Sequence, residues 1–168
     1  HEIIAEHPQE GRAALRRLYL YAGVVIGAIA TLTPAALLLR ELLLMIFGDS
    51  TGTMAALLDK LIVPISFVPV GLAVWLWHWR VLSREAGAFG ESEQGATVRR
   101  IYYYLMAAVG LALLWVGLVE LLHALLDTLL TGMSGPAGIW HEPLANGLSL
   151  LAVGAPIWAL HWRSVQHV

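Results

Sequence analysis

Four long apolar stretches constrain the fold of this chain more than any other feature. They cover residues 18–39, 61–79, 101–119 and 144–162. Each has about the length, roughly 20 residues, that a helix needs to cross the ~30 Å hydrocarbon core of a bilayer. Long parts of these stretches are apolar on every side, whereas a surface helix of a soluble protein has one polar face. We therefore predict an all-α integral membrane protein with four transmembrane helices.

The composition agrees with this prediction and excludes several classes of protein. Of the 168 residues, 58% are hydrophobic and 13% are charged, against about 45–50% and 25% in soluble domains. The net charge of −2 offers no general basic surface, so we expect the lipid bilayer as a partner and no nucleic acid. The chain contains no Cys, which excludes disulfides and thiolate metal sites.

Basic residues are distributed unevenly between the two ends of the predicted helices. Eight of the ten precede the first helix, separate the second from the third or follow the fourth, which leaves only Arg40 and Lys60 for the other end. Short loops rich in Lys and Arg stay in the cytoplasm. We therefore predict a multi-pass protein of the cell membrane with both termini cytoplasmic. The first apolar stretch is too long for a cleavable signal peptide, and no small-residue cleavage site follows it.

An internal repeat organises the chain. A shift of 83 residues aligns residues 16–83 with residues 99–166, and 18 of the 68 aligned positions are identical. The repeat predicts two tandem helical hairpins that enter the membrane from the same side, which is the parallel type of repeat, related by a pseudo-twofold axis along the membrane normal. The expected division is a cytoplasmic lead-in at 1–15, a first hairpin at 16–83, a cytoplasmic linker at 84–98 and a second hairpin at 99–168.

Two short motifs mark the ends of each copy. The opening R-R-L-Y-L-Y at 16–21 matches R-R-I-Y-Y-Y at 99–104, and the close W-L-W-H-W-R at 75–80 matches W-A-L-H-W-R at 158–163. This R-R-x-Y-x-Y opening and W-x-x-H-W-R close resemble an uncharacterised family of prokaryotic multi-pass membrane domains of unknown function. The resemblance covers both copies, about four-fifths of the chain. It implies paired transmembrane helices, and it carries no activity and no site residues.

A matched pair of histidines is the sharpest candidate for cofactor chemistry. The repeat places His78 and His161 at equal depth on the second and fourth helices, and we expect them to face one axis. Two such imidazoles can ligate a haem iron between helices, and one can hold the magnesium of chlorophyll. The simpler interpretation is that each ring anchors its helix among the lipid headgroups. We expect no cofactor, with haem or chlorophyll as the alternative.

A second candidate site lies on the outer part of the third helix. Glu120, His123 and Asp127 share one helix face at i, i+3 and i+7. The E-x-x-H spacing supplies two metal ligands per helix in di-iron bundles. Such a site would need the motif twice, and the first copy has Arg40 at the histidine position. The motif still allows a single zinc ion held by Glu120, His123 and Asp127.

The same equivalence suggests a charge cluster. A pseudo-twofold axis would bring Arg40 and Glu41 towards the face of Glu120 and Asp127, and ionisable groups inside a membrane are candidates for function. At 1.5 Å per residue, however, Arg40 stands about 35 Å beyond Arg17. The alternative is therefore a solvated or interfacial extension of the helix at the outer boundary of the bilayer.

Aromatic and basic side chains near the predicted cytoplasmic boundary are expected to anchor the helices there. Tyr and Trp gather where hydrocarbon meets headgroup, and Arg can bind anionic lipid headgroups. The expected anchors are Tyr19, Tyr21, Tyr102, Tyr104, Trp75, Trp79, Trp158, Trp162, Arg80 and Arg163.

Small and hydroxylated residues within the apolar stretches predict helix packing. Gly23 and Gly27 belong to a series at helical spacing that lets helices approach closely, either within the chain or against a partner. Ser66 and Ser149 are matched by the repeat and lie outside any G-x-S-x-G motif. We expect them to form hydrogen bonds between helices and to take no part in catalysis.

These observations favour a protein that acts by packing in the membrane. The sequence has no recognisable catalytic set, no phosphate-binding loop and only short predicted loops. We predict a non-catalytic membrane domain or accessory subunit, a four-helix bundle that packs with partner membrane subunits or with itself, or that anchors a larger complex. The alternatives are a tetrapyrrole protein for electron transfer or pigment binding that uses His78 and His161, and a small channel or transporter.

Overall fold

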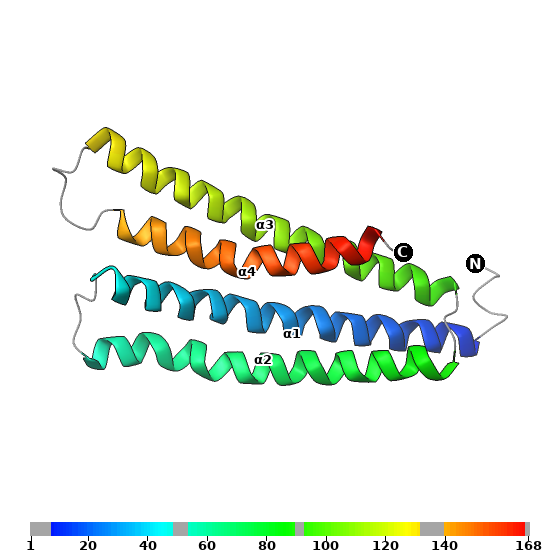
Figure 1. The fold of residues 1–168 in the computed structure, drawn as a ribbon. Coiled ribbons are helices and arrows are strands. Elements are labelled where there is room, and N and C mark those ends of the chain that lie inside the picture. The colour runs from blue at the N-terminus through cyan, green and yellow to red at the C-terminus, as the bar shows by residue number, and fades with distance from the viewer. Residues whose placement is uncertain (1–7, 49–53, 90–92, 132–139, 167–168) are drawn as a thin grey trace.

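The computed structural model describes residues 8–48, 54–89, 93–131 and 140–166, and almost all of them lie in four α-helices (Figure 1). These are α1 (Pro8–Ile46), α2 (Met54–Phe89), α3 (Glu93–Thr131) and α4 (His141–Gln166). The described residues contain no β-strand, so the all-α prediction is confirmed. Both α2 and α3 continue into the range assigned to the linker, since α2 ends at Phe89 and α3 begins at Glu93.

All four helices are long and apolar enough to cross a membrane, over Leu15–Ile46, Ala55–Arg84, Ala96–Leu130 and His141–Gln166. α1 and α3 have 39 residues each, which corresponds to about 58 Å of helix. This length exceeds the ~30 Å hydrocarbon core, so these helices must tilt, extend beyond it, or both.

Four prolines lie inside the helices without breaking them. They are Pro34 in α1, Pro64 and Pro69 in α2, and Pro156 in α4. Membrane helices tolerate such residues where neighbouring groups satisfy the freed carbonyl oxygens.

Equivalent glycines let the two helices of each hairpin approach closely. An ideal Cβ built on Gly27 would lie 2.7 Å from the backbone nitrogen of Trp75, and one built on Gly110 would lie 2.5 Å from that of Trp158. A shift of 83 residues converts the first contact into the second. Only glycine allows the backbones to approach this closely. The repeat is therefore present in the packing of the helices as well as in the sequence.

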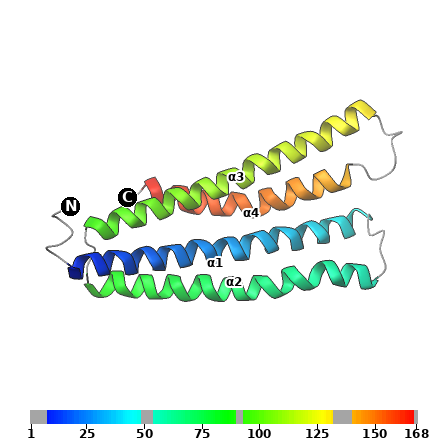
Figure 2. The same cartoon turned by 180° about the vertical axis from the view of Figure 1, so that it is seen from behind.

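Towards the ends of α1 and α3 the helices lie in a row in the order α3, α4, α1, α2, and α3 crosses α4 so that its first turns reach α1 (Figure 1 and Figure 2). The backbone of α1 approaches those of α2, α4 and α3, whereas within the described ranges the backbone of α2 approaches only that of α1. A pseudo-twofold axis would place α2 against α3 in the way that α4 lies against α1. The predicted pseudo-twofold relation is therefore wrong, and the repeat leaves α2 and α3 on opposite flanks.

The hairpins pack together near the end of the row where α1 and α3 begin and α2 and α4 end, which we call the basic end (Figure 1). Buried side chains from all four helices form a core here. They are Leu20, Tyr21, Val24, Ala28, Leu82, Tyr102, Met106 and Ile157. Although α2 and α3 are not adjacent, the ring of Trp79 reaches the ring of Tyr102 at 6.1 Å between centroids.

Several polar side chains within the helices donate hydrogen bonds to their own helix. The hydroxyl of Ser66 donates to the carbonyl oxygen of Ile62 at 2.7 Å, and that of Ser149 donates to the carbonyl oxygen of Asn146 at 2.9 Å. The same pattern holds for Thr31, Thr128 and Ser164. The predicted hydrogen bonds between helices at Ser66 and Ser149 are therefore wrong, because a carbonyl of the preceding turn already accepts each hydroxyl proton.

Candidate functional site

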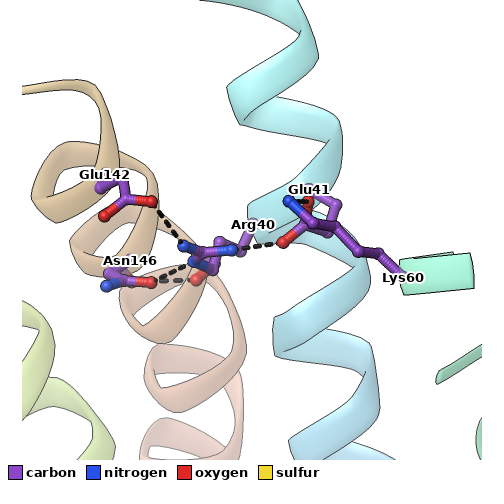
Figure 3. A network of polar contacts seen from close by, with 6 residues as sticks. Arg40, Glu41, Lys60, Glu142 and Asn146 are labelled. Atoms are coloured by element: carbon purple, nitrogen blue, oxygen red, sulfur yellow. Dashed lines mark hydrogen bonds and ion pairs between the residues drawn. The ribbon is translucent and has the colours of Figure 1, made fainter. Parts of the chain in front are cut away.

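A cluster of charged and polar side chains joins the two hairpins at the end opposite the basic end (Figure 3). Arg40 of α1 is its centre. The Arg40 Nε–H donates to Oδ1 of Asn146 in α4 at 2.7 Å, and Nη2 lies 3.4 Å from Oε1 of Glu142. Arg40 thus fastens α1 of the first hairpin to the first turns of α4 in the second hairpin.

The other side of the cluster lies within the first hairpin. Nη1 of Arg40 donates to Oε1 of Glu41, and Nζ of Lys60 in α2 lies 3.9 Å from the other carboxylate oxygen of Glu41. Two cations therefore face two carboxylates, those of Glu41 and Glu142, so the cluster is balanced in charge. The Glu41 side chain is only 11% exposed, and the cost of burying a carboxylate is offset by such partners.

A cavity of about 190 Å³ adjoins the cluster between α1, α3 and α4. Its polar lining comes from Arg40, Thr33, Asn146 and Ser149. The rest is aliphatic and comes from Ile29, Leu32, Ala36, Leu37, Val109, Leu113 and Leu150. An apolar space with a few polar groups at one end fits a hydrocarbon chain better than an ion or a charged metabolite.

The structure changes the predicted partners of Arg40. The sequence analysis placed Arg40 and Glu41 opposite Glu120 and Asp127 of α3, on the assumption of a pseudo-twofold axis. Arg40 contacts Glu142 and Asn146 instead. The reason is geometric, because α4 lies between α3 and α1 in the row (Figure 1).

The predicted metal ligands are only partly brought together. Nε2 of His123 lies 3.3 Å from Oδ2 of Asp127, four residues further along α3. Among the described residues, no three His or carboxylate side chains are arranged to hold a metal ion. Glu120 therefore does not complete a site with His123 and Asp127, although all three lie on one face of α3.

Each candidate haem-ligating histidine faces the first helix of its own hairpin. Nδ1 of His78 lies 2.8 Å from the carbonyl oxygen of Val74, and Nδ1 of His161 lies 2.8 Å from that of Ile157. A carbonyl oxygen can only accept, so Nδ1 carries the proton in both rings. Nε2 is then the acceptor in a neutral imidazole, and in His161 it lies 3.2 Å from the hydroxyl of Tyr102.

The two imidazoles pack in separate hairpins. His78 packs on Gly23 of α1, where an ideal Cβ would lie 2.5 Å from Nε2, and the ring of Tyr19 stands edge-on at 6.0 Å between centroids. His161 packs against Tyr102 of α3. Each hairpin thus holds its own Tyr–His pair, at positions related by the repeat. Ligation of one haem by both rings stays a prediction.

The predicted anchoring residues separate into two groups. Most lie near the basic end with exposed or partly exposed side chains, namely Tyr19, Tyr104, Trp75, Trp79, Trp158, Trp162, Arg80 and Arg163. Tyr21 and Tyr102 are buried, and their ring centroids lie 5.5 Å apart between α1 and α3. These two tyrosines hold the hairpins together and are not arranged to contact headgroups.

Comparison with known protein families identifies relatives of this architecture. The family described as a domain of unknown function (DUF5671) matches residues 1–65, 38–107 and 100–168, which together span the chain. The chain belongs to this family. No curated protein and no solved structure matches. The repeated matches to DUF5671 agree with a chain built from more than one similar helical segment, and they assign no activity to it.

Sequence reasoning missed two residues of the cluster in this DUF5671 member, Glu142 and Asn146. They lie four residues apart on one face of α4, and a polar pair at the start of an apolar helix was the signal that could have found them. The cluster has the character of a structural fastener, since every charge in it has a partner of opposite sign.

Proposed function

We propose that this chain is a non-catalytic membrane module that acts by packing against other membrane-embedded subunits, including copies of itself. In this proposal it is an accessory subunit or anchor within a larger assembly. Its transmembrane helices, its membership of a family of unknown function and its charge-balanced polar cluster are all compatible with such a role.

The observation that carries the proposal is the incomplete coverage of α2. Only 11% of the span in α2 is buried, against 33% in α1 and in α4. Apolar exposure alone is expected of a lipid-facing helix. The exposed surface of α2, however, also includes Asp59 and Ser66. Carboxylates in membrane helices usually face protein or water and not lipid, and a protein neighbour on this flank is what we propose.

The proposed location is the cell membrane, with the basic end in the cytoplasm. Arg16, Arg17, Arg80, Arg84, Arg99, Arg100 and Arg163 all lie towards the basic end, and positive residues favour the cytoplasmic side. Cysteine labelling tests this orientation, because the chain has no Cys of its own. A membrane-impermeant thiol reagent added to intact cells should label Gly48→Cys and spare Ser83→Cys. The reverse pattern would refute the orientation.

The function is tested by extracting the protein gently from its native membrane in polymer-bounded lipid discs. We expect an assembly larger than the 18.3 kDa chain, containing a stoichiometric protein subunit or further copies. Native mass spectrometry measures this directly. A single chain surrounded only by lipid would contradict the proposal.

The two alternatives remain testable in the same preparation. A tetrapyrrole protein would show a visible absorption band that His78→Ala or His161→Ala removes. His78 packs closely on Gly23, so the tetrapyrrole alternative has less support than the role as a membrane subunit. A channel or transporter would produce ion or solute flux in liposomes, and its path would have to pass the cluster around Arg40.

A further inference from the structure

The contact between the hairpins uses only one of two equivalent pairs of helix faces. The first helix of hairpin one, α1, presents a face with Ala36 and Arg40 to the second helix of hairpin two, α4. A shift of 83 residues maps this face of α1 onto α3 and the facing side of α4 onto α2. Within the described ranges, the backbones of α2 and α3 do not meet. The faces of α3 and α2 that correspond to the α1–α4 interface therefore have no partner helix within the described ranges. We call them the open surfaces, and one lies on each flank of the row.

The open surface on α3 corresponds to the α4-binding face of α1 residue by residue. Ile29, Leu32, Ala36 and Arg40 map onto Ala112, Trp115, Val119 and His123. The side of α3 that carries them is exposed, with Trp115 at 70% and Val119 at 51%. Beyond the end of α1, Phe47 lies against Trp140, the residue before α4, with ring centroids 6.1 Å apart. Its counterpart on α3 is Leu130, which is 82% exposed.

The open surface on α2 corresponds to the face of α4 that lies against α1, and it keeps some of the same side chains. Glu142, Ser149 and Val153 map onto Asp59, Ser66 and Val70, which keep the acid, the serine and the valine. Asn146 and Leu150 map onto Val63 and Phe67. All five positions on α2 are exposed, including Val63 at 59% and Phe67 at 56%.

The two open surfaces carry polar side chains at the positions of the Arg40–Glu142 pair. Arg40 reaches Glu142 across the α1–α4 contact. His123 holds the Arg40 position on α3, and Asp59 holds the Glu142 position on α2. A side chain that can donate a hydrogen bond therefore again stands opposite a carboxylate, and His123 also faces Asp127 on its own helix. The helix directions also agree, because α1 and α4 are antiparallel and so are α3 and α2.

From this equivalence we propose that the occupant of each open surface is a second copy of this chain. The α3 flank of one copy packs against the α2 flank of the next as α1 packs against α4 within the chain, with His123 beside Asp59. Such head-to-tail contacts are heterologous, so they produce a ring if the rotation closes and an extended row if it does not. This inference rests on the packing function proposed above and specifies its partner.

Cysteine cross-linking in membranes tests the contact, since the chain has no Cys to interfere. Val63→Cys and Val119→Cys are placed on chains with different tags, which are co-expressed and treated with a short bifunctional maleimide. Their equivalents, Asn146 and Ala36, line one cavity. The matched control is Ile65→Cys with Leu118→Cys. These residues are each 56% exposed and lie on other faces of the same helices.

We expect the Val63–Val119 pair to give at least about fivefold more product carrying both tags than the control pair, because a short reagent joins faces that stay together. Adding Asp59→Arg to the Val63→Cys chain should lower the yield roughly threefold, in line with a weak exposed ion pair. Adding His123→Glu to the Val119→Cys chain should then restore it. These substitutions lie on exposed positions, and recovery in the charge-swapped pair shows that both chains fold.

Three outcomes would overturn the inference. Equal yields from test and control pairs would mean that copies meet without this interface. Preferential Val63–Val63 product would indicate a twofold contact instead. Absence of any product between copies, in a protein that native mass spectrometry finds bound to a different subunit, would overturn self-association and leave the packing function standing. If cross-linking and native mass spectrometry both find a single chain, self-association and the packing function are both refuted.

Discussion

Replacement of Arg40 by Met should loosen the contact between the two hairpins. The substitution keeps an unbranched side chain of similar length and removes the guanidinium group. Nε then no longer donates to Asn146, and Glu41 keeps only the distant Lys60, 3.9 Å away. The hairpins lose their polar link at the end opposite the basic end, where the core of buried aromatic and aliphatic side chains does not reach.

The expected loss of stability can be worked from the three contacts of Arg40. Hydrogen bonds between membrane helices contribute about 0.6 kcal/mol on average and up to about 1.7 kcal/mol, which applies to Asn146. Leaving a buried acceptor such as Glu41 without its donor costs about 1–3 kcal/mol. Glu142 adds at most about 1 kcal/mol, because its side chain is 67% exposed and well screened. The free energy of unfolding should therefore fall by about 2–6 kcal/mol.

Reversible unfolding in mixed micelles, followed by circular dichroism or Trp fluorescence, measures this difference. Arg80→Met is the matched control, since Arg80 is exposed at the basic end, and it should change stability by less than about 0.5 kcal/mol. Adding Glu41→Gln to Arg40→Met should recover part of the loss, because it removes the unpaired charge. If Arg40→Met has no larger effect than Arg80→Met, the reasoning about the cluster is refuted.

Further predictions concern the equivalent contacts of the two hairpins. Tyr102→Phe should lower the free energy of unfolding by about 0.5–1.5 kcal/mol, because it removes the 3.2 Å contact with His161. Tyr19→Phe should have almost no effect, since Tyr19 meets His78 only edge-on. Equal effects of the two substitutions in unfolding titrations would contradict this difference. Gly110→Ala should cost about 1–3 kcal/mol because its Cβ would lie 2.5 Å from the backbone of Trp158, which cannot move aside as a side chain would. Ala108→Ser, at an exposed position of the same helix, should be close to neutral in that assay, and a tolerated Gly110→Ala would refute the close approach. Protein expressed with haem available should show no Soret band that depends on His78, since that ring is packed on Gly23, and a band lost in His78→Ala would favour the tetrapyrrole alternative.

The sequence was sufficient to predict the number of helices and their repeat, because hydrocarbon length and the 83-residue similarity act on whole segments. It was less informative about which faces meet. Residues such as Leu118 and Trp115 look equally suited to lipid and to another helix, so apolar periodicity does not indicate the neighbour. The pseudo-twofold relation was therefore assumed, and it led to the wrong partners for Arg40. The burial of Tyr21 and Tyr102 was missed for a similar reason, since an interfacial tyrosine and a tyrosine between helices have the same sequence context.

The bonds from Thr31, Ser66, Thr128 and Ser164 to carbonyl oxygens of the preceding turn have a consequence for biogenesis. Each helix satisfies these hydroxyl groups before it meets any neighbour, so it can leave the translocon for lipid by itself. Arg40 is different, because its bonds to Asn146 and Glu142 require α4. During synthesis more than 100 residues separate Arg40 from these partners, as the sequence separations of 106 and 102 show. Until then Arg40 and Lys60 of the first hairpin share Glu41 as their counter-charge, and the insertion of α4 completes the fold.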